Sequence, residues 1–438
     1  MDNRINAERI FLSGVRSVMP EKLISRNMSV EGSVLKIGDL SFSFKDIRNI
    51  YVIGAGKASA AMGHYVENIL GNRITEGHIV VKYGYSCKLR KIKVTEAGHP
   101  IPDLNGITAT RDILRIARQG AENDLVICLI SGGGSALMAD LPEGFLPEEL
   151  VIVNNLLIRS GASINEINTV RKHLSEVKGG QLVRAIWPAA SVSLILSDVA
   201  GNPLDVIASG PTVPDSTTFG EALKILSDYQ LTNDITLPVL NYLKEGEKGI
   251  RSETPKPGDP LFTKTFNILA GTNLIALEAA KETAIDLDYN TFIIESEMRG
   301  DVEHLAQSIV DTALCYKNNN EIKKPVCLLY GGEPTIKVTG EGLGGRNQHL
   351  ALSAAIKLQN KPGITILSAG TDGTDGPTKA AGAVVDSDTM HLALSIDIDP
   401  EKYLSEFDSF NFFKKTGGQI ITGPTFTNVM DLVVVIVE

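Results

Sequence analysis

Short apolar runs that lead directly into glycine-rich loops constrain the fold of this chain more than any other feature. Such runs precede the loops at residues 54–57, 131–135 and 197–201, and again at residues 331–333 and 370–376. Continuous Val, Ile and Leu runs are typical of buried parallel strands, and ligands bind at the carboxyl ends of such strands. Glycine in these loops lets backbone N–H groups approach an anion. The pattern predicts an α/β enzyme that handles phosphate groups.

Composition narrows the class of protein. The 438 residues are enough for two or three domains with buried cores, and the net charge of −10 argues against nucleic-acid binding, which usually needs a basic patch. No apolar run is long enough to cross a membrane, and the N-terminus lacks the pattern of a signal peptide. We therefore expect a cytoplasmic protein that binds neither nucleic acid nor membrane.

The cysteines show no sign of a metal site or a disulfide framework. None of Cys87, Cys128, Cys315 and Cys327 forms a CxxC pair, and Cys128 and Cys327 lie inside apolar runs. We expect thiols that are buried in a reducing cytoplasm.

Alternating strand and helix patterns predict two α/β domains. A small hairpin is expected around Gly38, and from residue 50 the pattern predicts a doubly wound, Rossmann-like parallel sheet. Residues 214–260 hold a helix at 219–229 and connections rich in Pro and Gly, so we place the domain boundary there. The predicted domains are residues 1–250 and residues 251–438, the second with a mixed sheet. We expect an active site in the cleft between them.

The first loop carries a lysine that fits neither common nucleotide motif. A P-loop would need glycine where Tyr51 stands, and the next apolar run ends in Lys82 where a dinucleotide fold needs an acidic residue. Gly54 and Gly56 are candidate ligand-binding glycines. Lys57 is expected at a helix N-terminus, where the helix dipole disfavours a cation unless an anion is bound. We predict that Lys57 contacts an anionic ligand; a solvated lysine is the alternative.

The second loop is a candidate anion-binding nest. Three consecutive glycines are costly for a simple turn, and their N–H groups could hold phosphate or carboxylate, although a turn without a ligand stays open. The absence of a G-x-S-x-G pattern makes a nucleophilic serine unattractive. The candidate binding residues are Ser131, Gly132, Gly133, Gly134 and Ser135.

Further candidates follow in the first half. Residues 168–178 supply cations, Arg171 and Lys178 among them, which either face solvent or contact a substrate or the other domain. Lys178 is taken as a candidate binding residue. Asp198 directly follows an apolar run, so it could bind magnesium or accept a proton from an attacking hydroxyl, with a helix N-cap as the alternative. We expect His99, in a Pro-rich loop, to be structural.

The second half supplies an arginine loop and an acidic loop. The planar guanidinium of Arg346 is well matched to a transferring phosphoryl group, with an exposed arginine as the alternative. Glu333 lies in a neighbouring glycine loop and is a candidate binding residue. Asp372 and Asp375 lack the glutamate of a calcium loop, so magnesium or nucleotide contacts, or a turn, are open for them. Asp372 is a tentative metal ligand.

Together these motifs resemble a known family. The chain is similar to the glycerate 2-kinases of the MOFRL family, a class separate from the P-loop kinases. The matching segments lie in order between residues 52 and 386, and the tail GPTFTNVMDL matches as well. They are VIGAGKASAAMG, LISGGGSALM, INTVRKHLSEVKGGQL, LSDVAGNPLDVIASGPTVPD, GGEPTIKVTGEGLGGRNQHLAL and SAGTDGTDGPTKAAGAVVD.

The resemblance implies an activity and two catalytic residues. It implies transfer of the ATP γ-phosphoryl group to the 2-hydroxyl of D-glycerate, with Mg²⁺ or another divalent cation, to give 2-phosphoglycerate and ADP. The family's catalytic lysine and arginine map onto Lys57 and Arg346. Met430 stands where many relatives have Asn, which puts a role of that side chain in doubt, while Asn428 and Asp431 match the pattern.

A division of labour between the domains follows as a hypothesis. The first domain would bind glycerate near Lys57 and residues 131–135, and the second would present Arg346 to the ATP phosphates; the reverse assignment stays open. Two other functions also stay open, an NAD(P)-dependent hydroxypyruvate reductase and a non-catalytic anion-binding regulator. A homodimer is possible, but no residue pattern argues for it.

Overall fold

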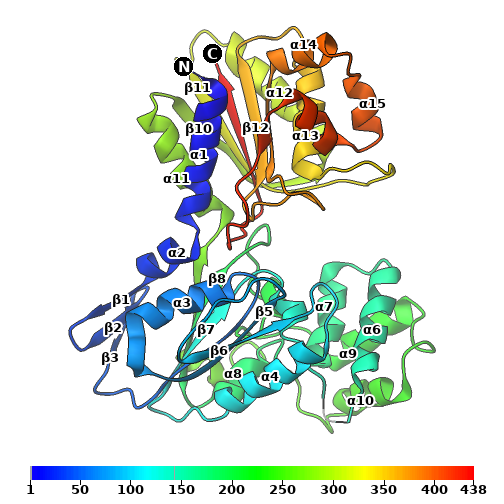
Figure 1. Ribbon diagram of the computed structural model, residues 1–438. Helices are drawn as coiled ribbons and strands as arrows, with labels where there is room; N and C mark the ends of the chain where they lie inside the picture. Colours follow the sequence, from blue (N-terminus) through cyan, green and yellow to red (C-terminus); the bar gives the residue numbers. More distant parts are fainter. Residues whose placement is uncertain (1, 143) are drawn as a thin grey trace. The chain divides into compact units, whose positions relative to one another are not determined.

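The chain forms two α/β units in the computed structural model, which describes residues 2–142 and 144–438 (Figure 1). The N-terminal unit comprises Leu23–Leu196 and Asn202–Ala270. The C-terminal unit comprises the chain up to Lys22, the segment Ser197–Gly201, and Gly271–Glu438. Each unit is built on a six-stranded sheet, so the predicted α/β class is confirmed.

The division differs from the predicted boundary between residues 250 and 251. Strand β9 (Thr265–Gly271) lies beside β8 (Ala190–Leu196) and completes the first sheet, although the predicted boundary assigns it to the second domain. Helix α1 (Asn3–Ser17) packs on α11 (Asn273–Asp286) of the C-terminal unit, where the Thr283 hydroxyl donates to Ser13 Oγ at 2.5 Å. These pairings join distant parts of the chain, so local patterns do not reveal them.

The sheet of the N-terminal unit has the doubly wound order that the sequence predicts. Its strands lie in the order β6-β5-β4-β7-β8-β9, and the pairs from β6 to β8 are parallel. The first strand of this sheet along the chain, β4, lies in its middle. Strands β5 and β6 follow on one side of β4, and β7 and β8 follow on the other. Such folds bind ligands at this change of strand order, between β4 and β7. Its further strands are β4 (Ile50–Ala55), β5 (Ile74–Lys82), β6 (Ile92–Ala97) and β7 (Leu125–Ile130).

Helices and a small sheet complete this unit. The predicted hairpin is present as β2 (Val34–Ile37) and β3 (Leu40–Ser43), with β1 (Met28–Glu31) paired to β2. The remaining helices are α2 (Pro20–Asn27), α3 (Ser59–Leu70), η1 (Gly71–Arg73), α4 (Leu104–Ala117), α5 (Gly134–Leu137), α8 (Gln181–Ile186), η2 (Ile207–Ser209) and η3 (Pro260–Lys264), besides the group described next.

Four helices of the N-terminal unit gather beside its sheet around an apolar core of their own (Figure 1). The predicted helix at 219–229 is confirmed as α9. Local sequence explains where two of these helices begin, since Ser163 with Glu166 and Thr218 with Glu221 form capping boxes. The group consists of α6 (Pro147–Arg159), α7 (Ile164–His173), α9 (Phe219–Asp228) and α10 (Leu237–Glu247).

The C-terminal unit has the predicted mixed sheet, in the order β10-β11-β15-β12-β13-β14. Only β10 and β11 run parallel among its paired strands, and the last strand, β15, is antiparallel to both of its neighbours. Every residue of β15 is buried, because it lies in the middle of the sheet. The strands are β10 (Asn290–Asp301), β11 (Val326–Thr335), β12 (Ile364–Gly370), β13 (Gly382–Asp386), β14 (Gln419–Ile420) and β15 (Asp431–Val437).

Helices α12 and α13 contribute to the core on this sheet. Helix α12 packs on α13, and both belong to a core that includes side chains of β11, β12 and β15. The helices of this part of the chain are α12 (Val302–Asn318), α13 (Arg346–Lys357), α14 (Ser387–Ser395), α15 (Pro400–Ser405) and α16 (Ser409–Thr416).

The cysteines agree only in part with expectation. Cys128 and Cys327 are buried in β7 and β11, and burial raises the pKa of the Cys128 thiol to about 12. Cys87 and Cys315 are exposed, so the prediction of buried thiols is wrong for these two. Among the described residues, no helix has both the length and the apolar character needed to span a membrane.

Candidate active site

The loops after β4 and β7 meet where the N-terminal sheet reverses its order. The Lys57 N–H donates to the Gly132 carbonyl at 2.9 Å, and Ser131 Oγ accepts from the Ala58 N–H at 3.0 Å. The structure therefore brings Lys57 and the loop of residues 131–135 together. Lys57 is half-buried and lies just before α3.

Gly54 and Gly56 allow the two strands to approach each other. A Cβ atom on Gly54 would lie 2.3 Å from the Leu129 carbonyl oxygen, and one on Gly56 would lie 2.2 Å from Ser131 Oγ. Gly56 also has a φ of +135°, which side chains rarely adopt. Both glycines thus shape the loop that carries Lys57, and neither faces open space.

The loop of residues 131–135 presents N–H groups without protein acceptors. Gly133 has a φ of +82° and precedes the short helix α5. Within the described part of the chain, the N–H groups of Gly132 and Gly133 donate to no protein group, whereas the Gly134 N–H donates to the Ser131 carbonyl at 3.2 Å. Successive N–H groups in such a turn can bind an anion.

A strained segment supports this loop. Ala208 and Ser209 have φ values of +50° and +62°, and both are buried. The Ser209 hydroxyl lies 2.8 Å from Ser135 Oγ and donates to Asn168 Oδ1 at 3.0 Å. Left-handed backbone at non-glycine residues is costly and is concentrated at functional sites. The strain therefore marks residues 207–210 as part of the site's framework.

His99 lies directly against the loop of residues 131–135. A Cβ atom on Gly133 would lie 2.9 Å from both Cδ2 and Nε2 of His99. Burial lowers the pKa of His99 to about 4, and the charges of Lys57 and Lys82 add to this effect. The expectation that His99 is structural stays a prediction.

A cavity of about 270 Å³ opens beside this loop within the N-terminal unit. Lys178 lines it but is already engaged, because its Nζ donates to the Met138 carbonyl at 2.9 Å and to Asp140 Oδ1 at 3.2 Å. Arg171 lines it too and donates from Nε to Asn154 Oδ1 at 2.7 Å. Among the described residues Arg171 has no acidic partner in an ion pair, and burial lowers its pKa.

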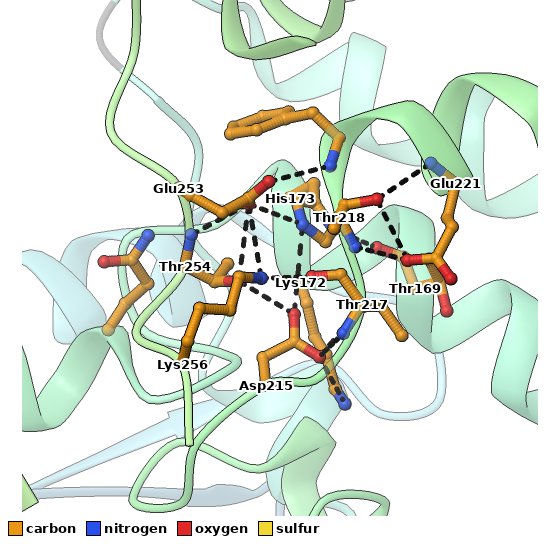
Figure 2. Close-up of polar contacts among 12 residues, drawn as sticks. Thr169, Lys172, His173, Asp215, Thr217, Thr218, Glu221, Glu253, Thr254 and Lys256 are labelled. Atoms are coloured by element: carbon orange, nitrogen blue, oxygen red, sulfur yellow. Dashed lines mark hydrogen bonds and ion pairs between the residues drawn. The ribbon is translucent and has the colours of Figure 1, made fainter. Parts of the chain in front are cut away.

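The other cations of α7, Lys172 and His173, are buried, do not line the cavity, and take part in polar contacts with neighbouring segments (Figure 2). Lys172 Nζ is 3.3 Å from Asp215 Oδ1, and His173 Nε2 is 2.9 Å from Glu253 Oε1. The Thr254 hydroxyl also donates to Asp215, at 3.0 Å. For Lys172 and His173, the alternative of a solvent-exposed helix face is therefore wrong, because these side chains form a buried network.

Asp198 belongs to the segment Ser197–Gly201 of the C-terminal unit. Within that unit the Ser197 N–H donates to the Gly271 carbonyl at 2.9 Å, and Arg299 Nη2 donates to the Ala200 carbonyl at 2.7 Å. These bonds fix the backbone on both sides of Asp198, whose side chain is half-buried.

Arg346 and Glu333 lie together in the C-terminal unit, joined by a third residue that sequence chemistry missed. Arg346 donates from Nη1 to Glu333 Oε1 at 2.8 Å, and from Nε to Asp431 Oδ2 at 2.6 Å. Burial alone would lower the pKa of Arg346, but the carboxylates of Asp431 and Glu333 raise it above its ordinary value. Asp431 is the first residue of the last strand, β15. In the sequence it is singled out only by its match to the family pattern.

Asp375 acts as a cap for α13. Its carboxylate accepts from the N–H groups of Asn347 at 3.0 Å and Gln348 at 2.8 Å, and from the Gln348 side chain at 3.0 Å. Asp375 is 2% exposed, and burial raises its pKa to about 6. Both carboxylate oxygens of Asp375 thus accept hydrogen bonds from the first turn of α13, which begins at Arg346. This arrangement fits a role in positioning Arg346 rather than contact with a nucleotide.

Asp372 lies at the carboxyl end of β12. Its Oδ1 accepts from the N–H and the hydroxyl of Thr374, each at 3.0 Å. A Cβ atom on Gly370 would lie 3.3 Å from Asp431 Oδ1 and 3.5 Å from Asp372 Oδ1, so the two carboxylates approach the same glycine. In the described part of the chain, no group of three or more His, Cys, Asp or Glu residues is arranged to hold a metal ion.

Comparison with known proteins places this geometry in a family. Residues 6–244 match the model described as a domain of unknown function, DUF4147, and residues 326–431 match the MOFRL family model. A D-glycerate 2-kinase from Thermotoga maritima is 42% identical over 89% of this chain and 91% of the relative. A glycerate 2-kinase from Pyrococcus horikoshii is 39% identical over 100% of this chain and 98% of the relative.

A solved structure extends the match to the whole fold. The crystal structure of a glycerate kinase from Thermotoga maritima has a TM-score of 0.89 and 38% sequence identity, and the match covers 100% of this chain and 99% of that one. One relative from Agrobacterium vitis, 38% identical over 87% of this chain and 85% of its own, carries a name that refers to hydroxypyruvate reduction instead. The chain belongs to the glycerate kinases that carry a MOFRL domain.

Proposed function

We propose that this chain is an ATP-dependent D-glycerate 2-kinase, which transfers the ATP γ-phosphoryl group to the 2-hydroxyl of D-glycerate. The observation that carries the proposal is the hydrogen bond from the Lys57 N–H to the Gly132 carbonyl, which places Lys57 beside the loop of residues 131–135 in a chain 42% identical to a D-glycerate 2-kinase. The choice of the 2-hydroxyl rests on the names of these relatives.

Charge neutralisation is the central requirement of this reaction. Phosphoryl transfer needs mainly positioning and stabilisation of charge on the transferred group. Lys57 and the two N–H groups supply positive charge in the N-terminal unit, and Arg346 supplies a fixed guanidinium in the C-terminal unit. We assign Lys57 and Arg346 as catalytic residues, with Glu333 and Asp431 orienting Arg346.

In this proposal two further acidic residues, Asp198 and Asp372, are candidates to accept the glycerate hydroxyl proton or to bind the divalent cation. A bond forms between the glycerate 2-oxygen and the γ-phosphorus, the bond from that phosphorus to the β,γ-bridging oxygen breaks, and ADP leaves. Asp198 is our candidate to accept the hydroxyl proton. A bound Mg²⁺ would neutralise phosphate charge, and it would be held mainly by the nucleotide with Asp198 or Asp372, since the described residues hold no preassembled metal cluster.

Assays with two cosubstrates, ATP and NAD(P)H, distinguish the proposed kinase from a hydroxypyruvate reductase. The purified protein is incubated with D-glycerate and MgATP, and separately with hydroxypyruvate and NADH or NADPH. We expect ADP to form in the first mixture and no nucleotide to be oxidised in the second. Oxidation of NAD(P)H without ADP formation would establish a reductase, and binding of glycerate or ATP without turnover would establish a non-catalytic regulator. We also propose that the protein is cytoplasmic, because ATP is available to a kinase there.

A further inference from the structure

The cavity of the N-terminal unit has a wall that D-glycerate cannot cover. Its apolar side chains come from α6 and from the loop after β6, and large ones remain open to solvent: Ile101 is 66% exposed and Ile158 is 60% exposed. Leu150 and Val151 continue this wall. Exposed apolar residues that line a cavity usually mark a ligand or partner site. A three-carbon acid with oxygen on every carbon has no apolar face to place against them.

The polar groups of the same cavity suit a polyphosphate. Gly133 and Ser135 line it from the loop in which the Gly132 and Gly133 N–H groups lack acceptors among the described residues. Arg171 lines it with no acidic partner among those residues. Lys57 and Lys82 both act on His99, another lining residue, so their charges reach this cavity. The cavity therefore combines an apolar wall with an excess of positive charge.

Sheet topology favours the same occupant. The cavity is lined by loops that follow β6 and β7, at the carboxyl edge of the sheet and beside its reversal point. Open α/β sheets bind nucleotides at this position. An adenine ring would cover the wall formed by α6, while the phosphates would meet Arg171 and the loop of residues 131–135.

We propose that this cavity is the nucleotide site, with adenosine on the wall of Leu150, Val151 and Ile158, and with Arg171 as a phosphate-binding residue. The N-terminal unit is then the ATP-binding unit, which is the reverse of the assignment expected from sequence. The identity of the nucleotide as ATP rests on the proposed kinase function, but the site itself rests on the cavity.

Calorimetric titration of ADP into the glycerate-free protein tests the site. Val151→Glu places a negative charge on the wall, and we expect it to weaken ADP binding by about tenfold or more. Ile152→Glu is the matched control, since Ile152 is the next residue on α6, is 39% exposed and does not line this cavity. If Val151→Glu fails to fold, Ile158→Glu takes its place, because Ile158 is largely exposed.

A second pair of variants tests the phosphate contact. Arg171→Met should weaken ADP binding and raise the KM for ATP more than the KM for glycerate, whereas Arg159→Met should leave both unchanged, because Arg159 is exposed at the end of α6 and does not line the cavity. Asn154, the hydrogen-bond partner of Arg171, stays in place in both variants. An unchanged ADP affinity in Arg171→Met would overturn the phosphate-binding role.

The outcomes separate this site from the proposed function. Loss of ADP binding in Val151→Glu supports the site even if the wild-type protein fails to phosphorylate glycerate. Unchanged ADP binding in that variant, with normal kinase turnover, overturns the site and leaves the kinase function standing. A raised KM for glycerate with unchanged ADP affinity would assign the cavity to glycerate and also overturn the proposal.

Discussion

Asp431 holds the guanidinium of Arg346 through two hydrogen bonds. Nε donates to Oδ2 at 2.6 Å and Nη2 donates to Oδ1 at 3.1 Å, a bidentate arrangement that fixes the plane of the guanidinium. The Asp431 side chain is only 2% exposed, whereas that of Arg346 is 32% exposed. A buried carboxylate therefore orients a cation that still reaches solvent, as a residue that binds a substrate phosphate requires.

Replacing Arg346 with lysine should preserve the positive charge but lose the fixed orientation that Asp431 gives to the guanidinium. A lysine ammonium cannot make the paired N–H contacts with Asp431, so its charge is no longer fixed in place. We expect Arg346→Lys to lower kcat by about 10³-fold, in line with other arginines that act on a transferring phosphoryl group. Steady-state kinetics with D-glycerate and MgATP give the value. Arg16→Lys, at an exposed position on α1, should retain wild-type turnover.

The two acidic partners of Arg346 should differ in their effect. Asp431→Asn removes the buried charge that holds the guanidinium, and we expect a loss of stability of about 2–4 kcal/mol together with reduced turnover. Glu333→Gln removes a partner whose side chain is 49% exposed, so it should cost about 1 kcal/mol or less. Urea unfolding of both variants measures the difference. Equal losses for the two variants would show that burial of Asp431 is not what matters.

Gly56 should tolerate no side chain. In Gly56→Ala the new Cβ would meet Ser131 Oγ at 2.2 Å, so the loops after β4 and β7 must move apart. Gly84→Ala is the matched control, since Gly84 also has a positive φ, of +82°, but a Cβ there meets no atom within 4 Å. We expect Gly56→Ala to lose most of its turnover and Gly84→Ala to cost only about 1 kcal/mol of stability. Similar behaviour of the two variants would refute the proposed close approach.

Two histidines of the N-terminal unit should make stability fall in mild acid. Burial lowers the pKa of His78 to about 4, with a contribution from Lys93, and burial also lowers the pKa of His99 to about 4. An unfolded histidine has a pKa of about 6.5, so between these values the unfolded chain binds protons that the native protein does not. This contribution to stability is complete above about pH 6.5 and is lost as the pH falls toward 4.

Urea unfolding across this pH range measures the effect. The free energy of unfolding should decrease as the pH is lowered from about 6.5 to about 4.5. The decrease should be smaller in His99→Gln, because one of the two titrating rings is gone. A decrease as large in His99→Gln as in the wild type would mean that His99 is not held neutral.

The sequence predicted the elements that depend on local patterns. Apolar runs and glycine loops revealed the strands that precede Lys57 and residues 131–135, since burial on both faces and close approach to a neighbour leave a local signature. The place of β9 beside β8 has no such signature. It depends on which edge of the sheet remains open once the other strands have paired.

Side-chain roles were harder to predict where like residues stand close together. Arg171 and Lys172 are neighbours on α7, yet one lines the cavity and the other pairs with Asp215, because Asp215 reaches α7 from a distant segment. Asp372 and Asp375 share one motif, yet Asp372 closes a local turn and Asp375 caps α13. The direction of each side chain is set by partners that lie far away in the sequence.

Phosphorus NMR of the reaction products tests the central claim most directly. The protein is incubated with D-glycerate and MgATP, and the phosphate monoester signal is compared with those of authentic 2-phosphoglycerate and 3-phosphoglycerate. We predict 2-phosphoglycerate and ADP in equal amounts. Formation of 3-phosphoglycerate, or of inorganic phosphate without a phosphorylated glycerate, would contradict the assignment of this chain as a glycerate 2-kinase.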